Sequence, residues 1–308
     1  MKNYLNIVKH ILENGIEKQD RTGTGVLSVA GVMFEHDMSD GFPLLTTKKM
    51  PFKVMSAELE FFIKGITDKE WLQTKKCHIW DEWPFQNYID SNNLWNKFPK
   101  YSNVWMEEKK KFIEKIKELP KTDEFVLKWW DLGPVYGHQW RNFNSEWVDQ
   151  IKNAIEQIKT NPTNRRIIVS AWNPAQMDKM LLPPCHAFFQ FNVDTTSNVL
   201  SLQLYQRSAD MFLWVPFNIA SYSTLLILIA KITWLKPGTF THTLWDAHIY
   251  NNHVDQVDEQ LSKKPKKLPK LKILKDIKSL EDIEKLEWED FELVWYESHG
   301  VIKAPVAV

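Results

Sequence analysis

The stretch Leu182-Pro183-Pro184-Cys185-His186-Ala187-Phe188-Phe189-Gln190-Phe191-Asn192-Val193 joins a proline pair and a cysteine to an alternating strand. Two prolines cannot continue a helix, so they impose an extended entry and fix the direction of the thiol. A second run at 201–207, after a turn at 194–198, predicts a β-hairpin. The alternation assigns one face to Phe189, Phe191 and Val193, and the other to His186, Phe188, Gln190 and Asn192.

Cys185 is a candidate nucleophile at the mouth of this strand. His186 is its neighbour and Arg207 lies on the next strand. A nearby cation lowers the pKa of a thiol, and the thiolate is the reactive form. A lone cysteine is more commonly a buried structural residue. The proline-cysteine run alone therefore favours catalysis no more than it favours a structural role.

The composition bounds the class of protein. The chain has 308 residues, which suits one large or two ordinary domains, and 44% of them are hydrophobic, enough for a substantial core. Lys+Arg and Asp+Glu both number 39, so no net charge attracts nucleic acid or an anionic membrane. Any phosphate must therefore be bound by local basic side chains.

The two cysteines, Cys77 and Cys185, provide neither a disulfide framework nor a metal-ligand cluster, so no metal is expected. A working thiol fits a reducing compartment. The chain does not begin with an apolar leader, and the apolar run around Leu225–Ala230 is too short to span a bilayer. We expect a cytoplasmic protein without a membrane segment.

The pattern along the chain predicts a mixed architecture. Helices are expected at 4–15, 51–64, 147–159, 217–234 and 252–261, and strands at 26–34, 165–171, 186–193, 201–207 and 242–250. The Lys- and Glu-rich segment 85–130 reads as a small variable helical insertion. Because no regular βαβ repeat is present, the fold expected is α/β of the α+β type, with a large mixed β-sheet, packed helices and this insertion, in one catalytic domain spanning 1–308.

Four arginines and several polar residues need a common explanation. Convergent arginines suit a phosphate dianion, because a guanidinium binds two oxygens at once. Each arginine alone is more commonly part of a surface ion pair. The four arginines are Arg21, Arg165, Arg166 and Arg207. A carboxylate, Glu58, also lies on an otherwise apolar helix. One polar cluster, Asn218, Ser221 and Tyr222, lies at the start of a buried helix, and a second is formed by Asp246, His248 and Tyr250.

Ordered motifs along nearly the whole chain resemble folate-dependent thymidylate synthases. Their order and spacing make the resemblance specific, and only the 85–130 insertion lies outside it. The motifs are the segments 21–25 (RTGTG), 41–48 (GFPLLTTK), 78–83 (HIWDEW), 133–137 (GPVYG), 165–173 (RRIIVSAWN), 184–186 (PCH), 206–210 (QRSAD), 216–222 (PFNIASY) and 246–250 (DAHIY).

The resemblance implies reductive methylation of dUMP to dTMP, with 5,10-methylenetetrahydrofolate giving the one-carbon unit and a hydride. Cys185 would attack C6 of the uracil, with Arg207 favouring its thiolate. Protons and ordered water would be handled by Glu58, Tyr136, His186 and Asp210. The nucleotide would be held by Arg21, Arg207, Ser208, Asn218, His248 and Tyr250, with Arg165 and Arg166 reaching over from the second subunit of a homodimer. The folate would contact Lys48, Ile79, Trp80, Trp83, Leu182, Asp210, Leu213, Trp214, Phe217 and Ala307.

Two alternatives remain open. Hydroxymethylases of this family add water instead of a hydride, and an inactive relative would only bind nucleotide or RNA. Asn218 favours a uracil base, and the complete tail 303–308 favours methylation because its closure excludes water. The chain also departs from the family, which usually has a small residue at four positions that carry tryptophan: Trp214, Trp234, Trp245 and Trp295. For Trp214, compensated packing is the favoured explanation, and a narrowed folate cleft or an altered cofactor choice are the alternatives.

Overall fold

The computed structural model describes residues 1–20 and 22–306, centred on a six-stranded sheet. The strand order is β1-β2-β6-β5-β4-β3, and every neighbouring pair is antiparallel except β5 and β6. The predicted mixed sheet is therefore confirmed. The strands are β1 (Ile16–Lys18), β2 (Val26–Asp37), β3 (Ile168–Ser170), β4 (His186–Asp194), β5 (Val199–Asp210) and β6 (Lys236–Tyr250).

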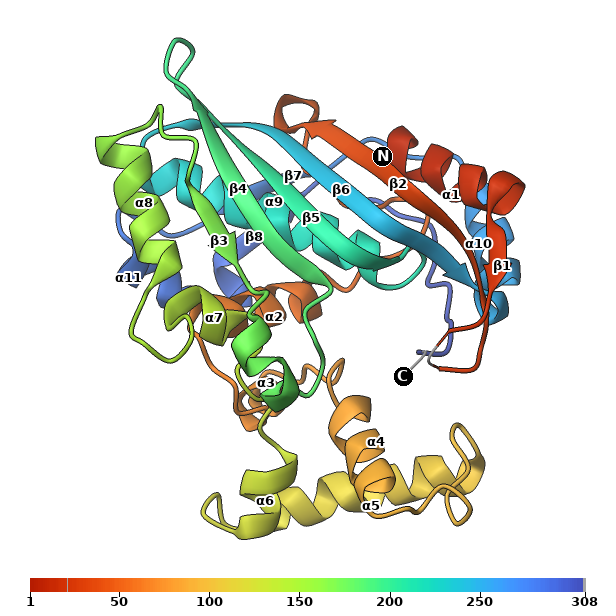
Figure 1. Ribbon diagram of the computed structural model, residues 1–308. Helices are drawn as coiled ribbons and strands as arrows, with labels where there is room; N and C mark the ends of the chain where they lie inside the picture. Colours follow the sequence, from red (N-terminus) through yellow and green to blue (C-terminus); the bar gives the residue numbers. More distant parts are fainter. Residues whose placement is uncertain (21, 307–308) are drawn as a thin grey trace.

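Helix α9 (Trp214–Ile232) is the crossover that joins the parallel strands β5 and β6. It lies behind the sheet beside α2 (Phe52–Ile63), while the opposite face of the central strands carries no helix (Figure 1). At 19 residues, α9 is long and apolar enough to cross a membrane, longer than the apolar run predicted from sequence. Because 83% of its most apolar window is buried inside the protein, α9 is a core helix.

The remaining helices surround this centre. Three of them, α4, α5 and α6, project from the sheet at the bottom of Figure 1 and share a hydrophobic cluster that includes Phe85, Trp105 and Trp130. The division into a catalytic domain and an 85–130 insertion stays a prediction. The helices are α1 (Lys2–Asn14), α3 (Glu70–Thr74), α4 (Glu82–Ser91), α5 (Asn103–Glu118), α6 (Glu124–Trp129), α7 (Gly137–Arg141), α8 (Gln150–Thr160), α10 (Val254–Leu261) and α11 (Leu280–Glu284).

Several sequence-based boundaries were wrong, including the starts of α8, β3 and β6. Helix α8 begins at Gln150, because the Asp149 side chain accepts a hydrogen bond from Lys152 N and caps it there. Strand β3 begins only at Ile168, so Arg165 and Arg166 precede it. Strand β6 starts at Lys236 and is 15 residues long, because its amino-terminal half pairs with β5 despite Pro237 and Gly238.

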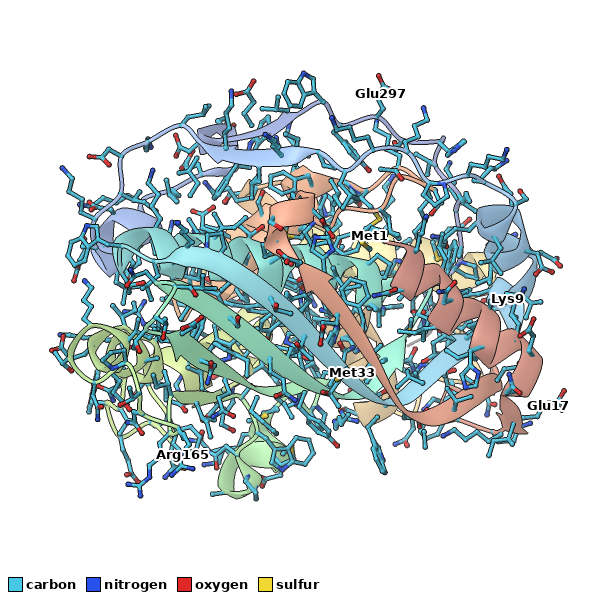
Figure 2. All side chains as sticks on the ribbon, turned by 90° about the horizontal axis from the view of Figure 1, so that it is seen from above. Met1, Lys9, Glu17, Met33, Arg165 and Glu297 are labelled. Carbon is cyan, nitrogen blue, oxygen red and sulfur yellow. The ribbon has the colours of Figure 1, made fainter. Side chains whose placement is uncertain are left out.

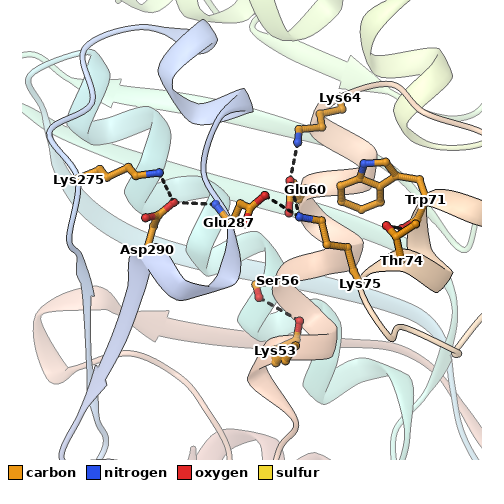
Figure 3. Close-up of polar contacts among 10 residues, drawn as sticks. All are labelled: Lys53, Ser56, Glu60, Lys64, Trp71, Thr74, Lys75, Lys275, Glu287 and Asp290. Atoms are coloured by element: carbon orange, nitrogen blue, oxygen red, sulfur yellow. Dashed lines mark hydrogen bonds and ion pairs between the residues drawn. The ribbon is translucent and has the colours of Figure 1, made fainter.

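Ion pairs through Lys75 connect Glu287, in the C-terminal part of the protein, to Glu60 of α2 (Figure 3). Lys75 lies 2.9 Å from Glu287 and 3.9 Å from Glu60 of α2. Glu60 also accepts from Lys64, and burial raises the pKa of its carboxyl. These contacts hold the segment carrying the strand pair β7 (Lys270–Ile273) and β8 (Phe291–Val294) behind the sheet.

Three tryptophans have the left-handed backbone conformation that favours glycine. Trp147, Trp234 and Trp295 have φ of 61°, 57° and 61°, and their exposed fractions are 87%, 76% and 66%. Compensated packing therefore does not explain Trp234 or Trp295, because most of each ring faces solvent. A left-handed residue other than glycine costs about 1–2 kcal/mol, and exposed rings regain little of it.

We expect the triple variant Trp147→Gly, Trp234→Gly and Trp295→Gly to be more stable than the parent. The gain should be about 0.5–1 kcal/mol per site, because glycine removes the strain but loses more chain entropy on folding. The midpoint of urea unfolding measures it. Trp245→Gly is the matched control, since Trp245 is 56% exposed on β6 but is not among the left-handed residues. An unchanged or lower midpoint for the triple variant would contradict the strain argument.

Candidate active site

A cavity of about 560 Å³ opens where the carboxyl ends of β5 and β6 meet α2 and the loop before β4. This volume suits a small organic ligand. The cavity brings together 15 of the residues predicted from sequence: Glu58, Ile79, Trp80, Trp83, Tyr136, Leu182, Cys185, His186, Arg207, Ser208, Asp210, Trp214, Asn218, His248 and Tyr250.

Five other predicted residues lie outside the cavity wall. Leu213 and Phe217 flank it at the start of α9, and Arg165 and Arg166 are exposed before β3. Lys48 is buried, where its ammonium group donates to the carbonyl of Phe212 and burial lowers its pKa to about 8. The two remaining predictions, Arg21 and Ala307, lie outside the described residues.

Sequence reasoning assigned no role to several lining residues: Lys18, Asp20, Gln206 and Asp246. Asp246 carried a signal, because it precedes His248 and Tyr250 at the two-residue spacing of one strand face. Its carboxylate bonds to Lys18 Nζ and Ser28 Oγ, both at 2.6 Å. Hydrogen bonds, first from His248 and then from Lys18 and Ser28, hold the pKa of Asp246 far below its usual range. Asp246 thus fixes a cation and a histidine at one end of the cavity.

The loop carrying Cys185 is held at both backbone groups of that residue. Its N–H donates to Tyr136 Oη at 2.8 Å, and its carbonyl accepts from Arg207 N at 2.8 Å. The Arg207 side chain donates from Nε to the Pro184 carbonyl at 2.9 Å and from Nη2 to the Pro183 carbonyl at 2.7 Å. The proline pair therefore presents the thiol from a fixed loop, with a guanidinium group beside it.

The orientation predicted for His186 was wrong. A β-bulge between His186 and Phe188 turns His186 inward, where it is buried, stacks on Tyr136 at 4.0 Å and bonds to Tyr222 Oη at 2.7 Å. Burial lowers the pKa of its imidazole to about 3, so the ring is neutral at pH 7. Arg207, not His186, is therefore the cation beside the thiol.

Glu58 is a carboxyl group with a pKa in the range useful for proton transfer. It is buried on α2 and accepts a hydrogen bond from Trp80 Nε1 at 2.8 Å. Burial raises its pKa to about 7, and the bond from Trp80 opposes part of that rise. A carboxyl group that titrates near pH 7 can both accept and donate a proton under working conditions.

We expect Glu58→Gln to become more stable relative to the parent as pH rises from about 4.5 to 7. In the parent, the pKa of Glu58 is higher in the folded than in the unfolded protein. Its contribution to stability is therefore fully present below the unfolded pKa and is lost as pH rises through the folded pKa, whereas glutamine does not titrate. The difference in the free energy of unfolding should reach about 3 kcal/mol at most. Urea unfolding at pH 4, 6 and 8 measures it. Glu13→Gln on the exposed end of α1 is the control, and parallel curves for both variants would contradict the assignment.

Two parts of the cavity wall differ in chemistry. Asn218 Oδ1 is buried without a hydrogen-bond partner in the described structure, so it is available to a ligand donor. The rings of Trp80, Trp83 and Trp214 follow one another at centroid distances of 5.4 Å and 6.0 Å, and Phe217 lies 5.8 Å from Trp214. Such an aromatic wall suits a flat ring system. Trp214 is thus part of the cavity wall and not only core filling.

The thymidylate synthase sequence profile matches residues 2–308. The chain belongs to the thymidylate synthase family. It is similar to proteins named thymidylate synthase from Mycoplasma mobile (51% identical), Malacoplasma penetrans (49%) and Mesoplasma florum (49%), each aligned over 308 residues and the full length of both chains. The similarity therefore includes the 85–130 segment.

Family membership establishes the reaction class. The enzyme is a methyltransferase of nucleotide biosynthesis that converts dUMP to dTMP, and the family uses methylenetetrahydrofolate. The profile and the three relatives give no support to the hydroxymethylase alternative. Within residues 1–20 and 22–306, no group of three or more His, Cys, Asp or Glu side chains is placed to bind a metal ion.

Proposed function

We propose that this cavity methylates dUMP through a covalent bond between Cys185 Sγ and C6 of the uracil. The observation that carries the proposal is the clamped Cys185 loop, which opens into the same cavity as Glu58 and Asn218. Thiolate addition at C6 moves the electron pair of the C5–C6 double bond to C5, which then attacks the one-carbon unit. Methylenetetrahydrofolate supplies that unit and later a hydride.

Asn218 hydrogen-bonds the uracil base, and Arg207 and Arg21 bind the phosphate. An amide offers both a donor and an acceptor, so the free Asn218 Oδ1 accepts the uracil N3–H while its amino group donates to O4. His248 and Tyr250 hold the sugar hydroxyl at the carboxyl end of β6. Arg207 uses two of its five donors on the proline carbonyls, which leaves others for phosphate beside Ser208 and Arg21.

Glu58 handles proton transfer, and the C-terminal segment excludes water. Glu58 protonates and deprotonates the base through ordered water, because its pKa near 7 keeps both forms present. Tyr136 aligns Cys185, and His186 stays neutral and orients Tyr136. The folate lies along the aromatic wall near Ile79 and Leu182, with Asp210 at its polar edge. The C-terminal segment, which includes Ala307, closes over the folate and keeps water from the methylene group.

A second copy of the chain completes the site. The helix-free sheet face exposes Met33 (58%), Trp245 (56%), Ile168 (45%) and Phe188 (37%), an apolar surface suited to a partner. Arg165 lies on the same side of the molecule as Met33 and opposite Glu297 (Figure 2). Arg165 and Arg166 therefore reach the phosphate in the neighbour's cavity within a cytoplasmic homodimer.

We expect a mixture of Arg166→Ala and Cys185→Ser proteins to recover activity after dissociation and reassociation. A heterodimer contains one cavity with both an intact thiol and the partner's arginine, so about a quarter of all cavities should work if the subunits mix randomly. The rate of dTMP formation before and after mixing measures recovery. Sedimentation supplies the control, since a monomer at the assay concentration would contradict the shared site.

The direct test of the function is turnover of dUMP with methylenetetrahydrofolate by the purified protein. Formation of dTMP supports the mechanism. Tight binding of dUMP with no product of any mass would instead support the inactive binding relative.

A further inference from the structure

His253 lies between the folate end of the cavity and the C-terminal segment. It ends the short 3₁₀ turn Asn251–His253 that follows β6, and its side chain is fully buried. Its Nε2 lies 2.7 Å from the carbonyl oxygen of Pro305. Because a carbonyl only accepts, the proton is on Nε2 and the ring donates to the tail.

The other ring nitrogen faces the cavity. Nδ1 of His253 lies 3.9 Å from Oδ1 of Asp210, a residue of the cavity wall. Asp210 Oδ1 is already occupied by the backbone N–H groups of Phe212 and Leu213, at 3.0 and 3.1 Å. Asp210 Oδ2 and His253 Nδ1 are both buried without a hydrogen-bond partner in the described part of the chain. The imidazole thus lies between a cavity carboxylate with an open position and the backbone of the tail, and its hydrogen bond is the one to the tail.

The tail has few other polar attachments near this point. Further back, His299 N donates to Thr46 O and Lys49 N donates to Gly300 O. Among residues 301–306, which the structure describes, the bond from His253 to Pro305 is the one hydrogen bond to the rest of the chain. Phe212 and Tyr250 pack against the imidazole at 5.5 Å each, so the ring direction is fixed.

We propose that His253 is a positioning residue that holds the C-terminal segment over the folate end of the cavity. This inference rests on the proposed function of that end. Loss of the donor should release the tail, weaken folate retention and let water reach the methylene group, while dUMP alone should bind as before.

His253→Phe tests the proposal, because it keeps an aromatic ring against Phe212 and Tyr250 but removes the donor. His253→Gln restores a donor near the Nε2 position. His299→Phe is the matched control, since His299 makes an equivalent bond to the Lys264 carbonyl at 2.9 Å farther back in the tail. Trypsin cleavage after Lys303, without ligands, reports opening of the tail, and steady-state kinetics report its effect on catalysis.

We expect His253→Phe to raise both the cleavage rate and the KM for methylenetetrahydrofolate by about 3–10-fold, the effect of one lost hydrogen bond. The Kd for dUMP should not change, and His253→Gln should recover most of both properties. Unchanged cleavage and KM in His253→Phe would overturn the proposal, as would a glutamine variant as impaired as the phenylalanine variant. If the parent forms no dTMP, the proposed function fails, whereas the cleavage comparison still tests the attachment of the tail.

A separate observation concerns the three left-handed tryptophans, Trp147, Trp234 and Trp295. The chain contains 15 tryptophans and only 10 glycines, although glycine at its usual share of about 7% would number about 22. A single codon, UGA, is read as tryptophan in some bacteria and as glycine in others. We infer that UGA encodes these three positions and that the cells of origin read it as glycine, because the backbone there already has the glycine conformation.

Peptide masses of the protein purified from its own cells test this inference. Peptides spanning 147, 234 and 295 should each be lighter than the printed sequence requires, by the difference between tryptophan and glycine. Trp105, Trp130 and Trp140 are fully buried core residues and supply the control, since their peptides should keep tryptophan. Tryptophan at all three left-handed positions would overturn the inference.

Discussion

Cys185→Ser is expected to abolish dTMP formation and to leave dUMP binding largely intact. Serine keeps the shape of the loop, including the backbone bonds to Tyr136 and Arg207. A serine hydroxyl is a far weaker nucleophile than a thiolate at neutral pH. The kcat should fall by about 10⁴-fold or more, the scale on which enzymes lose activity with their covalent nucleophile. Product formation measured by mass and dUMP binding measured by calorimetry together check both parts.

Cys77→Ser is the matched control for this experiment. Cys77 is fully buried away from the cavity wall, and burial raises the pKa of its thiol to about 12, so it is not a nucleophile at neutral pH. Its replacement should change stability more than turnover. Near-full activity of Cys185→Ser would show that the covalent step does not occur at this residue.

Asn218→Asp is expected to reduce kcat/KM for dUMP by about 10²–10³-fold and to improve the use of dCMP. The buried Oδ1 of Asn218 suits the uracil N3–H, and the amino group suits O4. A protonated aspartate reverses both roles, because its hydroxyl donates to N3 of cytosine and its other oxygen accepts from the exocyclic amine. A site built on paired polar groups rejects the wrong base, because its own buried groups are then left unpaired.

Competition between dUMP and dCMP, with products separated by mass, measures the change of base preference. Asn14→Asp at the exposed end of α1 makes the same substitution outside the cavity wall and should alter neither rate. An Asn218→Asp enzyme that retained the parent preference for dUMP would contradict the assigned role.

Periodicity predicted the elements whose burial repeats along the chain. The β4–β5 hairpin and the apolar helix α9 are examples, because alternating phenylalanines and a continuous apolar run leave few other conformations. The inward turn of His186 was not predictable from alternation, because a single-residue bulge reverses the face of a strand. The extra length of β6 depends on pairing with β5, a tertiary contact that overrides the local signal of Pro237 and Gly238.

The candidate site was more predictable than the conformations around it. Cys185 and Asn218 stand in ordered motifs, and Glu58 is a carboxylate on an otherwise apolar helix, so each carries a signal in the sequence. Lys18 was missed because a lysine in a short strand carries no pattern of its own, and only the 2.6 Å contact with Asp246 gives it a place. The buried bond from His253 to the tail joins residues 52 positions apart and likewise left no signal in the sequence.

The central claim is that a hydride, and not water, completes the one-carbon transfer in this cavity. The most direct measurement uses dUMP and methylenetetrahydrofolate labelled with deuterium at C6 of its reduced ring. The nucleotide product is weighed while dihydrofolate is followed by absorbance. Hydride transfer should give dTMP carrying one deuterium in its methyl group and one dihydrofolate for each dTMP. A hydroxymethylated nucleotide without deuterium and without dihydrofolate would contradict it.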